Sequence, residues 1–304
     1  MDKREVAVCG FYNKSCKVMF EFKAKGIRAT EIEGKDYLRI DQGGVSAIYP
    51  WENLPEPHGI KYLLMDLDGT SAMSEKFWIY IISLTTATLL GDGSFSLKEE
   101  DAPYVQGFTT LAHLEYCKKK YGFKQSLDEA NALYHKIAKE ELDKAMKGVG
   151  VEHAFVPRPG LKDFLLKAKG KGIKIGLATS GLEYKAVPEI VSVFRELGMG
   201  DPLSFYDATI TGGKRKSGAG YGTMGELCAK PHPWVYRELA LGLGVEDFST
   251  AVALEDSSSG VISAHLAGLN VIGLDDGNLI ESGFDKGCYK MVSSLDEVWE
   301  LLNK

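Results

Sequence analysis

The 304-residue chain has little of what marks membrane, secreted and nucleic-acid-binding proteins. Its most apolar stretch, residues 77–90, is interrupted by serine and threonine and is too short to span a bilayer. The sequence begins MDKRE, without the apolar segment of a signal peptide. Its 36 Lys and Arg against 42 Asp and Glu leave a net charge of −6, which gives no electrostatic reason to expect nucleic acid. We therefore expect no membrane and no nucleic-acid partner.

Cysteine is also scarce, and its spacing excludes further classes. The five cysteines are odd in number and lack the paired spacing of a zinc site. Reduced thiols are typical of the cytoplasm, so the sequence predicts a cytoplasmic protein. Apolar residues, in contrast, make up 44% of the chain, which indicates a well-packed core. The length of 304 residues is enough for two domains or for one domain with a large insertion.

The chain is organised around residues 62–70, YLLMDLDGT. An apolar run that ends in two carboxylates is typical of a strand buried on both faces of a parallel sheet. Residues i and i+2 of a strand point the same way, so Asp66 and Asp68 are predicted to face one pocket at the carboxyl end of the sheet. Gly69 suits a sharp turn there. The alternative is a simple polar turn after the strand.

The helix and strand patterns predict an α/β fold with an insertion. After residue 160, strands are expected at 173–178, 205–210, 251–254 and 271–274, and helices at 161–169, 186–197, 234–241, 262–267 and 295–302. Ser294 and Glu297 form a predicted capping box for the last helix. Residues 71–157 lack strand alternation, and helices at 75–90, 109–121 and 126–147 predict a helical insertion directly after the first core strand.

The first 50 residues have a different pattern. Short alternating runs separated by glycines predict four or five antiparallel strands, and the proline-rich residues 50–59 indicate a linker. We expect this module to cover a sheet edge, dock on the core or build an oligomer interface, so that its removal leaves the chemical step nearly intact. Substrate or partner binding is the alternative.

Three further polar stretches follow predicted strands or precede helices. After one strand come the small hydroxyl residues Thr179 and Ser180, where the Thr179 hydroxyl and the backbone N–H groups at the helix start suit a phosphoryl oxygen, although capping of the next helix is the alternative. Lys230 precedes Pro-His-Pro, which suits a fixed cation that neutralises phosphate, or else a solvated surface charge. Glu255 and Asp256 end another strand, where acidic residues commonly cap the following helix.

Two acidic strand ends in one parallel sheet would gather three or four carboxylates around one pocket. That much negative charge is unfavourable without a cation. Hard oxygen ligands select Mg2+, which keeps several waters and pairs with a substrate phosphate. The sequence therefore predicts Mg2+ as a cofactor.

With these stretches in order, the chain resembles the haloacid dehalogenase superfamily, in particular the capped group that holds phosphoglycolate phosphatase and β-phosphoglucomutase. The resemblance covers residues 60–304 and rests on the motifs DLDGT at 66–70, Thr179, KPHP at 230–233, and LEDS at 254–257 with Gly260. It implies a Rossmann-like α/β fold of three layers around a parallel sheet. The expected division is residues 1–58 for the β module and linker, 59–70 plus 158–304 for the core, and 71–157 for a helical cap.

The resemblance also implies a mechanism. Asp66 is expected to attack phosphorus and form an aspartyl-phosphate, and Asp68 to act as general acid and then as general base. Thr179, with Ser180 beside it, is expected to bind the phosphoryl group, while Lys230 neutralises charge beside the nucleophile. A carboxylate at position 68 favours phosphate chemistry over carbon–halogen hydrolysis.

For the metal, the resemblance implies a site built from Asp66, the backbone carbonyl of Asp68, and Asp256. Glu255 is expected as a further ligand or as a group that supports the ligands. The expected partner is a small phosphorylated metabolite. A second copy of this chain, bound through the N-terminal module in a homo-oligomer, is the other partner considered.

Two differences from the mutases favour simple hydrolysis of a phosphate monoester. Thr70 follows the motif glycine where the mutases generally carry valine. Residues 105–110, VQGFTT, resemble the substrate-specificity loop, with Thr110 in place of a basic residue that grips a second phosphate. Thr110 is therefore a candidate substrate contact. A phosphosugar mutase is the alternative, and a binding or scaffold protein built on the N-terminal module is a third hypothesis.

The basic, glycine-rich stretch 211–222 fits neither the motifs nor a P-loop, because its glycines lack the required spacing. A surface loop is one interpretation. A flap that brings positive charge to an anionic substrate is the other.

Overall fold

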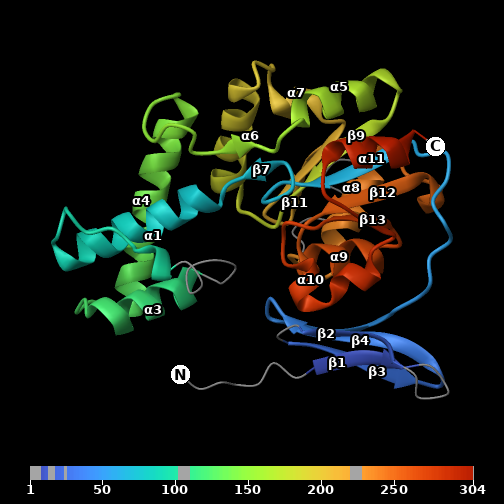
Figure 1. The fold of residues 1–304 in the computed structure, drawn as a ribbon, viewed down its shortest axis with the longest axis horizontal. Coiled ribbons are helices and arrows are strands. Elements are labelled where there is room, and N and C mark those ends of the chain that lie inside the picture. Colours follow the sequence, from blue (N-terminus) through green and yellow to red (C-terminus); the bar gives the residue numbers. More distant parts are fainter. Residues whose placement is uncertain (1–7, 13–17, 24–25, 102–109, 220–227, 304) are drawn as a thin grey trace. The chain divides into compact units, whose positions relative to one another are not determined.

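The computed structural model describes residues 8–12, 18–23, 26–101, 110–219 and 228–303, and every structural statement below refers to these residues (Figure 1). The chain divides into two compact units. The larger comprises Met1–Ser71, Arg158–Glu183 and Met199–Lys304, and the smaller comprises Ala72–Pro157 and Tyr184–Gly198. None of the helices in the described part of the chain combines the length and apolarity needed to cross a bilayer.

A seven-stranded sheet forms the centre of the larger unit (Figure 1). Its strands are β6 (Tyr62–Asp66), β9 (Lys174–Ala178), β10 (Ala208–Thr211), β11 (Lys214–Ser217), β12 (Ala251–Glu255), β13 (Asn270–Leu274) and β14 (Lys290–Val292). They lie in the order β11-β10-β9-β6-β12-β13-β14, and every neighbouring pair except β10 and β11 is parallel. Because β6 and β12 are adjacent and parallel, their carboxyl ends meet at one edge of the sheet.

The two central strands are apolar on both faces. Leu63, Leu64 and Met65 of β6 are fully buried, and every residue of β12 is buried as well. A parallel sheet covered by helices has no solvent-facing side, which is why these strands read as continuous apolar runs. The α/β fold predicted from those runs is confirmed.

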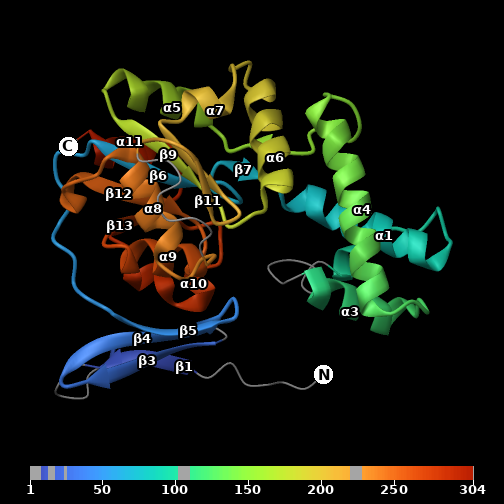
Figure 2. The same cartoon turned by 180° about the vertical axis from the view of Figure 1, so that it is seen from behind.

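Helices cover the sheet on both faces (Figure 2). The main ones are α5 (Leu161–Gly170), α8 (Trp234–Leu243), α9 (Ser258–Leu266) and α11 (Leu295–Leu302), with the short α7 (Pro202–Phe205), α10 (Leu279–Ser282), η2 (Phe248–Thr250) and η3 (Phe284–Gly287) between them. The neighbours α8 and α9 pack on β6, β9, β10, β12 and β13, whereas α5 and α11, also in contact with each other, pack on β9 and β14.

At the N-termini of α9 and α11 the structure differs from the sequence predictions, in the first residue of α9 and in the capping of α11. The hydroxyl of Ser257 accepts the N–H of Gly260 at 3.1 Å, so α9 begins at Ser258, four residues before the predicted start. The hydroxyl of Ser294 accepts the N–H of Glu297 at 3.3 Å, but the Glu297 carboxylate accepts from the N–H and hydroxyl of Ser293 instead. The predicted capping box at α11 is therefore only half formed.

Five antiparallel strands precede the core, in agreement with the predicted four or five. They are β1 (Val8–Tyr12), β2 (Val18–Lys23), β3 (Ile27–Ile32), β4 (Lys35–Gln42) and β5 (Val45–Pro50), arranged as a β1-β2 pair and a β3-β4-β5 sheet. Ile27, Leu38 and Ile40 are at most 3% exposed and belong to one apolar cluster with residues of α8 and α9. The module therefore docks on the core through the apolar face of its three-stranded sheet.

The smaller unit is mainly helical. It contains α1 (Glu75–Leu90), η1 (Glu99–Asp101), α3 (Thr110–Tyr121) and α4 (Leu127–Met146), the antiparallel pair β7 (Ala72–Met73) and β8 (Val156–Pro157), and all but the first residue of α6 (Glu183–Glu196). Ser126 forms the complete capping box of α4 with Glu129. Arg195 of α6 donates to the carbonyl of Ala145 at 2.7 Å and so covers the end of α4.

Candidate active site

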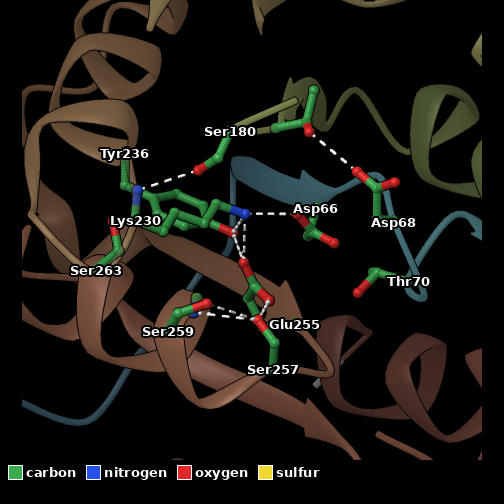
Figure 3. Close-up of polar contacts among 12 residues, drawn as sticks. Asp66, Asp68, Thr70, Ser180, Lys230, Tyr236, Glu255, Ser257, Ser259 and Ser263 are labelled. Carbon is green, nitrogen blue, oxygen red and sulfur yellow. Dashed lines mark hydrogen bonds and ion pairs between the residues drawn. The ribbon is translucent and has the colours of Figure 1, made fainter. Parts of the chain in front are cut away.

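A buried lysine joins the ends of the two central strands. Lys230 Nζ lies 2.5 Å from Oδ1 of Asp66 and 2.6 Å from Oε1 of Glu255 (Figure 3). The side chains of Asp66, Glu255 and Lys230 are 8%, 0% and 6% exposed, so Lys230 is not a solvated surface charge. The ammonium group is shared by two carboxylates from neighbouring strands.

Burial controls the electrostatics of this group. Loss of solvent and the nearby Glu255 carboxylate raise the pKa of Asp66 well above its ordinary value, although Lys230 opposes the shift. Loss of solvent and the charge of Glu255 also raise the pKa of Asp256 to about 7. Burial alone would lower the pKa of Lys230, but the attraction of Asp66 and Glu255 outweighs it and raises that pKa. The site therefore holds more negative charge than Lys230 neutralises.

Glu255 has partners at both carboxylate oxygens. Oε1 accepts from the Tyr236 hydroxyl at 2.5 Å as well as from Lys230, and Oε2 accepts from the Ser257 hydroxyl at 3.2 Å (Figure 3). A Cβ on Gly260 would lie 1.9 Å from the Glu255 carboxyl carbon, so only glycine fits beside it. These contacts suit a group that supports Lys230 better than one that coordinates a metal directly.

Asp68 lies at the same edge as Asp66 but in different surroundings (Figure 3). The strand ends at Asp66, and the side chain of Asp68 is exposed where that of Asp66 is buried. Oδ2 of Asp68 accepts from the Thr179 hydroxyl at 3.0 Å, and this hydroxyl accepts the N–H of Gly181 at 2.8 Å. The hydroxyl of Ser180 accepts the backbone N–H of Lys230 at 3.0 Å. Both predicted hydroxyl residues thus lie at the site.

The turn after Asp68 brings Asp256 close. Gly69 has φ +82°, and a Cβ there would lie 2.2 Å from Oδ2 of Asp256, so the turn requires glycine. The hydroxyl of Thr70 donates to Oδ1 of Asp256 at 3.1 Å. Nε of Arg158 donates to the carbonyl of Thr70 at 2.8 Å, and its guanidinium pairs with both carboxylate oxygens of Asp276 at 3.0 Å. Arg158 and Tyr236 were not predicted from the sequence.

Three carboxylates at this edge have the arrangement of a cation site. One oxygen from each of Asp66, Glu255 and Asp256 lies within 4.8 Å of the others. The surplus negative charge and the all-oxygen donor set fit a hard divalent cation such as Mg2+. Both oxygens of Glu255 accept hydrogen bonds from side chains, Oε1 from Lys230 and Oε2 from Ser257. The carboxylate of Asp256 accepts from the Thr70 hydroxyl at Oδ1 and therefore suits the role of metal ligand better.

Two other predicted features belong to elements that do not carry the carboxylate cluster. Thr110 is the first residue of α3 in the smaller unit, and the rest of the predicted specificity loop, 105–109, lies outside the described residues. The basic stretch begins as the β10–β11 hairpin rather than as a loop. Arg215 is 3% exposed and pairs with buried Glu238 at 2.7 Å, and Lys216 pairs with Glu183 at 2.6 Å, so these two charges are neutralised within the chain. Residues 220–222 are not among those described.

A cavity of about 560 Å3 lies where β5 meets α8. Its lining includes Tyr49, Pro233, Trp234 and Arg237, with none of the predicted catalytic or metal residues. It is therefore distinct from the carboxylate cluster.

Comparison with known proteins agrees with this fold. Residues 60–268 match the family model described as haloacid dehalogenase-like hydrolase. No curated protein sequence gives a match. Among solved structures, CbbY from Rhodobacter sphaeroides in complex with phosphate is 22% identical with a TM-score of 0.58, and the match covers 79% of this chain and 96% of CbbY.

Two further solved structures have the same fold. A candidate β-phosphoglucomutase from Thermotoga maritima is 22% identical with a TM-score of 0.59, over 80% of this chain and 99% of that protein. A predicted phosphoglycolate phosphatase from Haemophilus somnus is 16% identical with a TM-score of 0.58, over 80% and 98%. At these identities the likeness establishes the fold.

The fold and the site together define an α/β enzyme with a buried carboxylate at the end of its central strand. The family match spans more than half of the chain. The chain therefore belongs to the haloacid dehalogenase-like hydrolases.

Proposed function

We propose that the chain is a Mg2+-dependent phosphatase that hydrolyses a small phosphate monoester through an aspartyl-phosphate at Asp66. The observation that carries the proposal is the position of Lys230, between Asp66 and Glu255 at an edge with surplus carboxylate charge. A single fixed ammonium holds Oδ1 of Asp66 and leaves Oδ2 to attack phosphorus. The same ammonium offsets the charge that a phosphate would bring.

Asp68 is the proposed proton carrier. Its exposed side chain, unlike buried Asp66, can exchange protons with a leaving group and with water. It gives a proton to the alcohol oxygen as the ester bond to phosphorus breaks. It then takes a proton from the water that attacks the aspartyl-phosphate, which releases phosphate and regenerates Asp66. The hydroxyl of Thr179, 3.0 Å from Oδ2, orients Asp68 for both steps.

Asp66, Asp256 and the backbone carbonyl of Asp68 are the proposed holders of Mg2+, which when bound would neutralise charge on the phosphoryl oxygens. Thr70 orients Asp256 through its hydrogen bond. Glu255 supports the site through Lys230 rather than as a ligand. Ser180 acts in this proposal by holding the backbone of Lys230, at 3.0 Å.

The proposed substrate is a small phosphorylated metabolite, with Thr110 as a contact in the cap. The phosphate complex of CbbY supports phosphate chemistry on this fold. The likeness to a candidate β-phosphoglucomutase keeps a phosphosugar mutase as the second function. The cytoplasmic location and the division into a β module, a core and a cap remain predictions from the sequence.

The test is phosphate release from a panel of phosphate monoesters with Mg2+, with EDTA, and with the variant Asp66→Asn. We expect turnover only with Mg2+, because the carboxylates need a second cation. The asparagine side chain keeps the shape of the aspartate but lacks the attacking charge, so kcat should fall by roughly three orders of magnitude or more. Thermal unfolding checks that the variant is folded. Full turnover in EDTA, or more than about a tenth of wild-type kcat in the variant, would contradict the mechanism.

A further inference from the structure

His232 links the N-terminal module to the segment that carries Lys230. Its side chain is buried, and its ring nitrogens both contact the module: Nδ1 lies 2.9 Å from the hydroxyl of Tyr49, and Nε2 lies 3.2 Å from the carbonyl of Gln42. A carbonyl only accepts, so Nε2 carries the hydrogen, and in a neutral ring Nδ1 accepts from Tyr49. Both partners come from the β4–β5 hairpin, which pairs Gln42 with Val45.

The segment from Lys230 to His232 is held at both ends. The hydroxyl of Ser180 accepts the N–H of Lys230 at 3.0 Å, and the hydroxyl of Ser263 on α9 donates to the carbonyl of His232 at 2.6 Å. Tyr49 adds the side-chain anchor and also packs edge-on against His232, with ring centroids 5.8 Å apart. Only Pro231 stands in sequence between this anchored histidine and the lysine whose ammonium holds Asp66.

We propose that the N-terminal module is a positioning part of the catalytic site. Tyr49 and the Gln42 carbonyl hold His232, and through it they keep Lys230 between Asp66 and Glu255. The positioning of Lys230 by the module is argued from these contacts. The effect of that positioning on turnover rests on the proposed phosphatase function. From the sequence we expected removal of the module to leave the chemical step nearly intact. We now expect instead that the module is needed for full kcat.

A second attachment lets this link be tested without detaching the module. The ring of Trp51 stacks on His265 of α9, with centroids 3.8 Å apart and planes at 12°, and Nε2 of His265 lies 2.9 Å from the carbonyl of Glu52. Ile27, Leu38 and Ile40 also pack on the core. Loss of one hydroxyl at Tyr49 therefore leaves the module docked.

The experiment compares Tyr49→Phe with the matched control Tyr289→Phe. The Tyr289 hydroxyl donates to Glu56 at 3.2 Å, so the control also removes a bond between the core and the residues before it, but far from Lys230 in sequence and contacts. Two quantities are measured: the rate at which Lys230 is reductively methylated, by mass spectrometry, and kcat and KM for the best phosphate monoester. His232→Asn, which lacks the bond to Gln42, repeats the test from the other end of the link.

In Tyr49→Phe we expect methylation of Lys230 to accelerate severalfold and kcat to fall by roughly threefold to tenfold, with KM within about twofold of wild type, since one neutral hydrogen bond is lost. Tyr289→Phe should match wild type in both quantities. Unchanged Lys230 methylation in Tyr49→Phe and His232→Asn overturns the proposal. If Lys230 is methylated faster in Tyr49→Phe but the wild-type protein releases no phosphate from any monoester, the positioning is supported and the proposed phosphatase function is contradicted. A higher KM with unchanged kcat and unchanged methylation assigns Tyr49 to substrate binding and also overturns it.

Discussion

Gly260 shapes the site although it has no side chain. It lies at the start of α9, and an added Cβ would come within 2.0 Å of three atoms of the Glu255 carboxyl group. That carboxyl group has little room to move, because Lys230, Tyr236 and Ser257 all donate to it. A methyl group at position 260 would therefore displace Glu255 and leave Lys230 with one carboxylate instead of two.

Gly260→Ala tests this contact, with Gly170→Ala as control. A Cβ at Gly170, the last residue of α5, meets nothing within 4 Å. We expect Gly260→Ala to lose about 1–3 kcal/mol of unfolding free energy through overpacking, together with much of its kcat. The control should be neutral or stabilised by up to about 1 kcal/mol. Denaturant unfolding and phosphate release measure both effects, and a fully active, stable Gly260→Ala would contradict the account of Glu255.

The charged residues of the site were predictable, and their supporting residues were not. Asp66 and Asp68 stand after an apolar strand, a local pattern that a sequence displays directly. Tyr236 resembles any aromatic residue on the buried face of a helix, and its bond to Glu255, 19 residues away in sequence, depends on how α8 packs against β12. Arg158 lies between two prolines, a signal that marks a turn but does not reveal its bonds to the carbonyl of Thr70 and to Asp276.

Among the elements, β11 shows why charge patterns alone are ambiguous. Lys214–Ser217 reads as a basic surface loop or flap, yet it forms an antiparallel edge strand with β10. The partner of Arg215 is Glu238 on α8, 23 residues away, and both side chains are nearly fully buried. Only the folded chain brings these two together. A buried charge of this kind requires its partner, since an unpaired one would cost several kcal/mol.

Because His265 is the partner of Trp51 and Glu52, we expect the docking of these residues on α9 to depend on pH. Burial lowers the pKa of His265 to about 4, from an ordinary value of about 6.5. The neutral ring is therefore favoured in the docked state. Its contribution is fully present above pH ~6.5 and is lost as the pH falls towards 4, by at most about 3 kcal/mol.

The prediction is that wild-type protein loses more thermal stability between pH 7 and pH 5 than His265→Gln does. A glutamine amide can still donate to the carbonyl of Glu52 but does not titrate in this range. Unfolding midpoints of both proteins at both pH values give the comparison, and other titrating groups cancel in the difference. Equal losses in the two proteins would show that His265 does not control the acid sensitivity.

For the whole molecule, the sequence located the residues of the candidate site more closely than those that would select a substrate. The residues of the candidate site follow strands of one sheet or precede helices that pack on it, and the parallel topology brings these positions to a common edge. They are the carboxylates, Lys230 and Thr179. Residues expected to select the substrate lie in the smaller unit, and 105–109 lie outside the described residues. The two proposed functions, phosphatase and mutase, would share the attack by Asp66 and would differ in what happens to the aspartyl-phosphate.

The final prediction separates these two outcomes. A mutase must protect its aspartyl-phosphate from water and bind a second phosphate. The hydroxyl of Thr70 is buried and bonded to Asp256 at 3.1 Å, so this residue supports the carboxylate cluster, and Thr110 adds no positive charge. We expect steady phosphate release from a monophosphate substrate, without a bisphosphate activator. Incubation with sugar 1-phosphates, following both free phosphate and the 6-phosphate isomer, tests this directly, and an isomer that forms faster than free phosphate would favour the mutase instead.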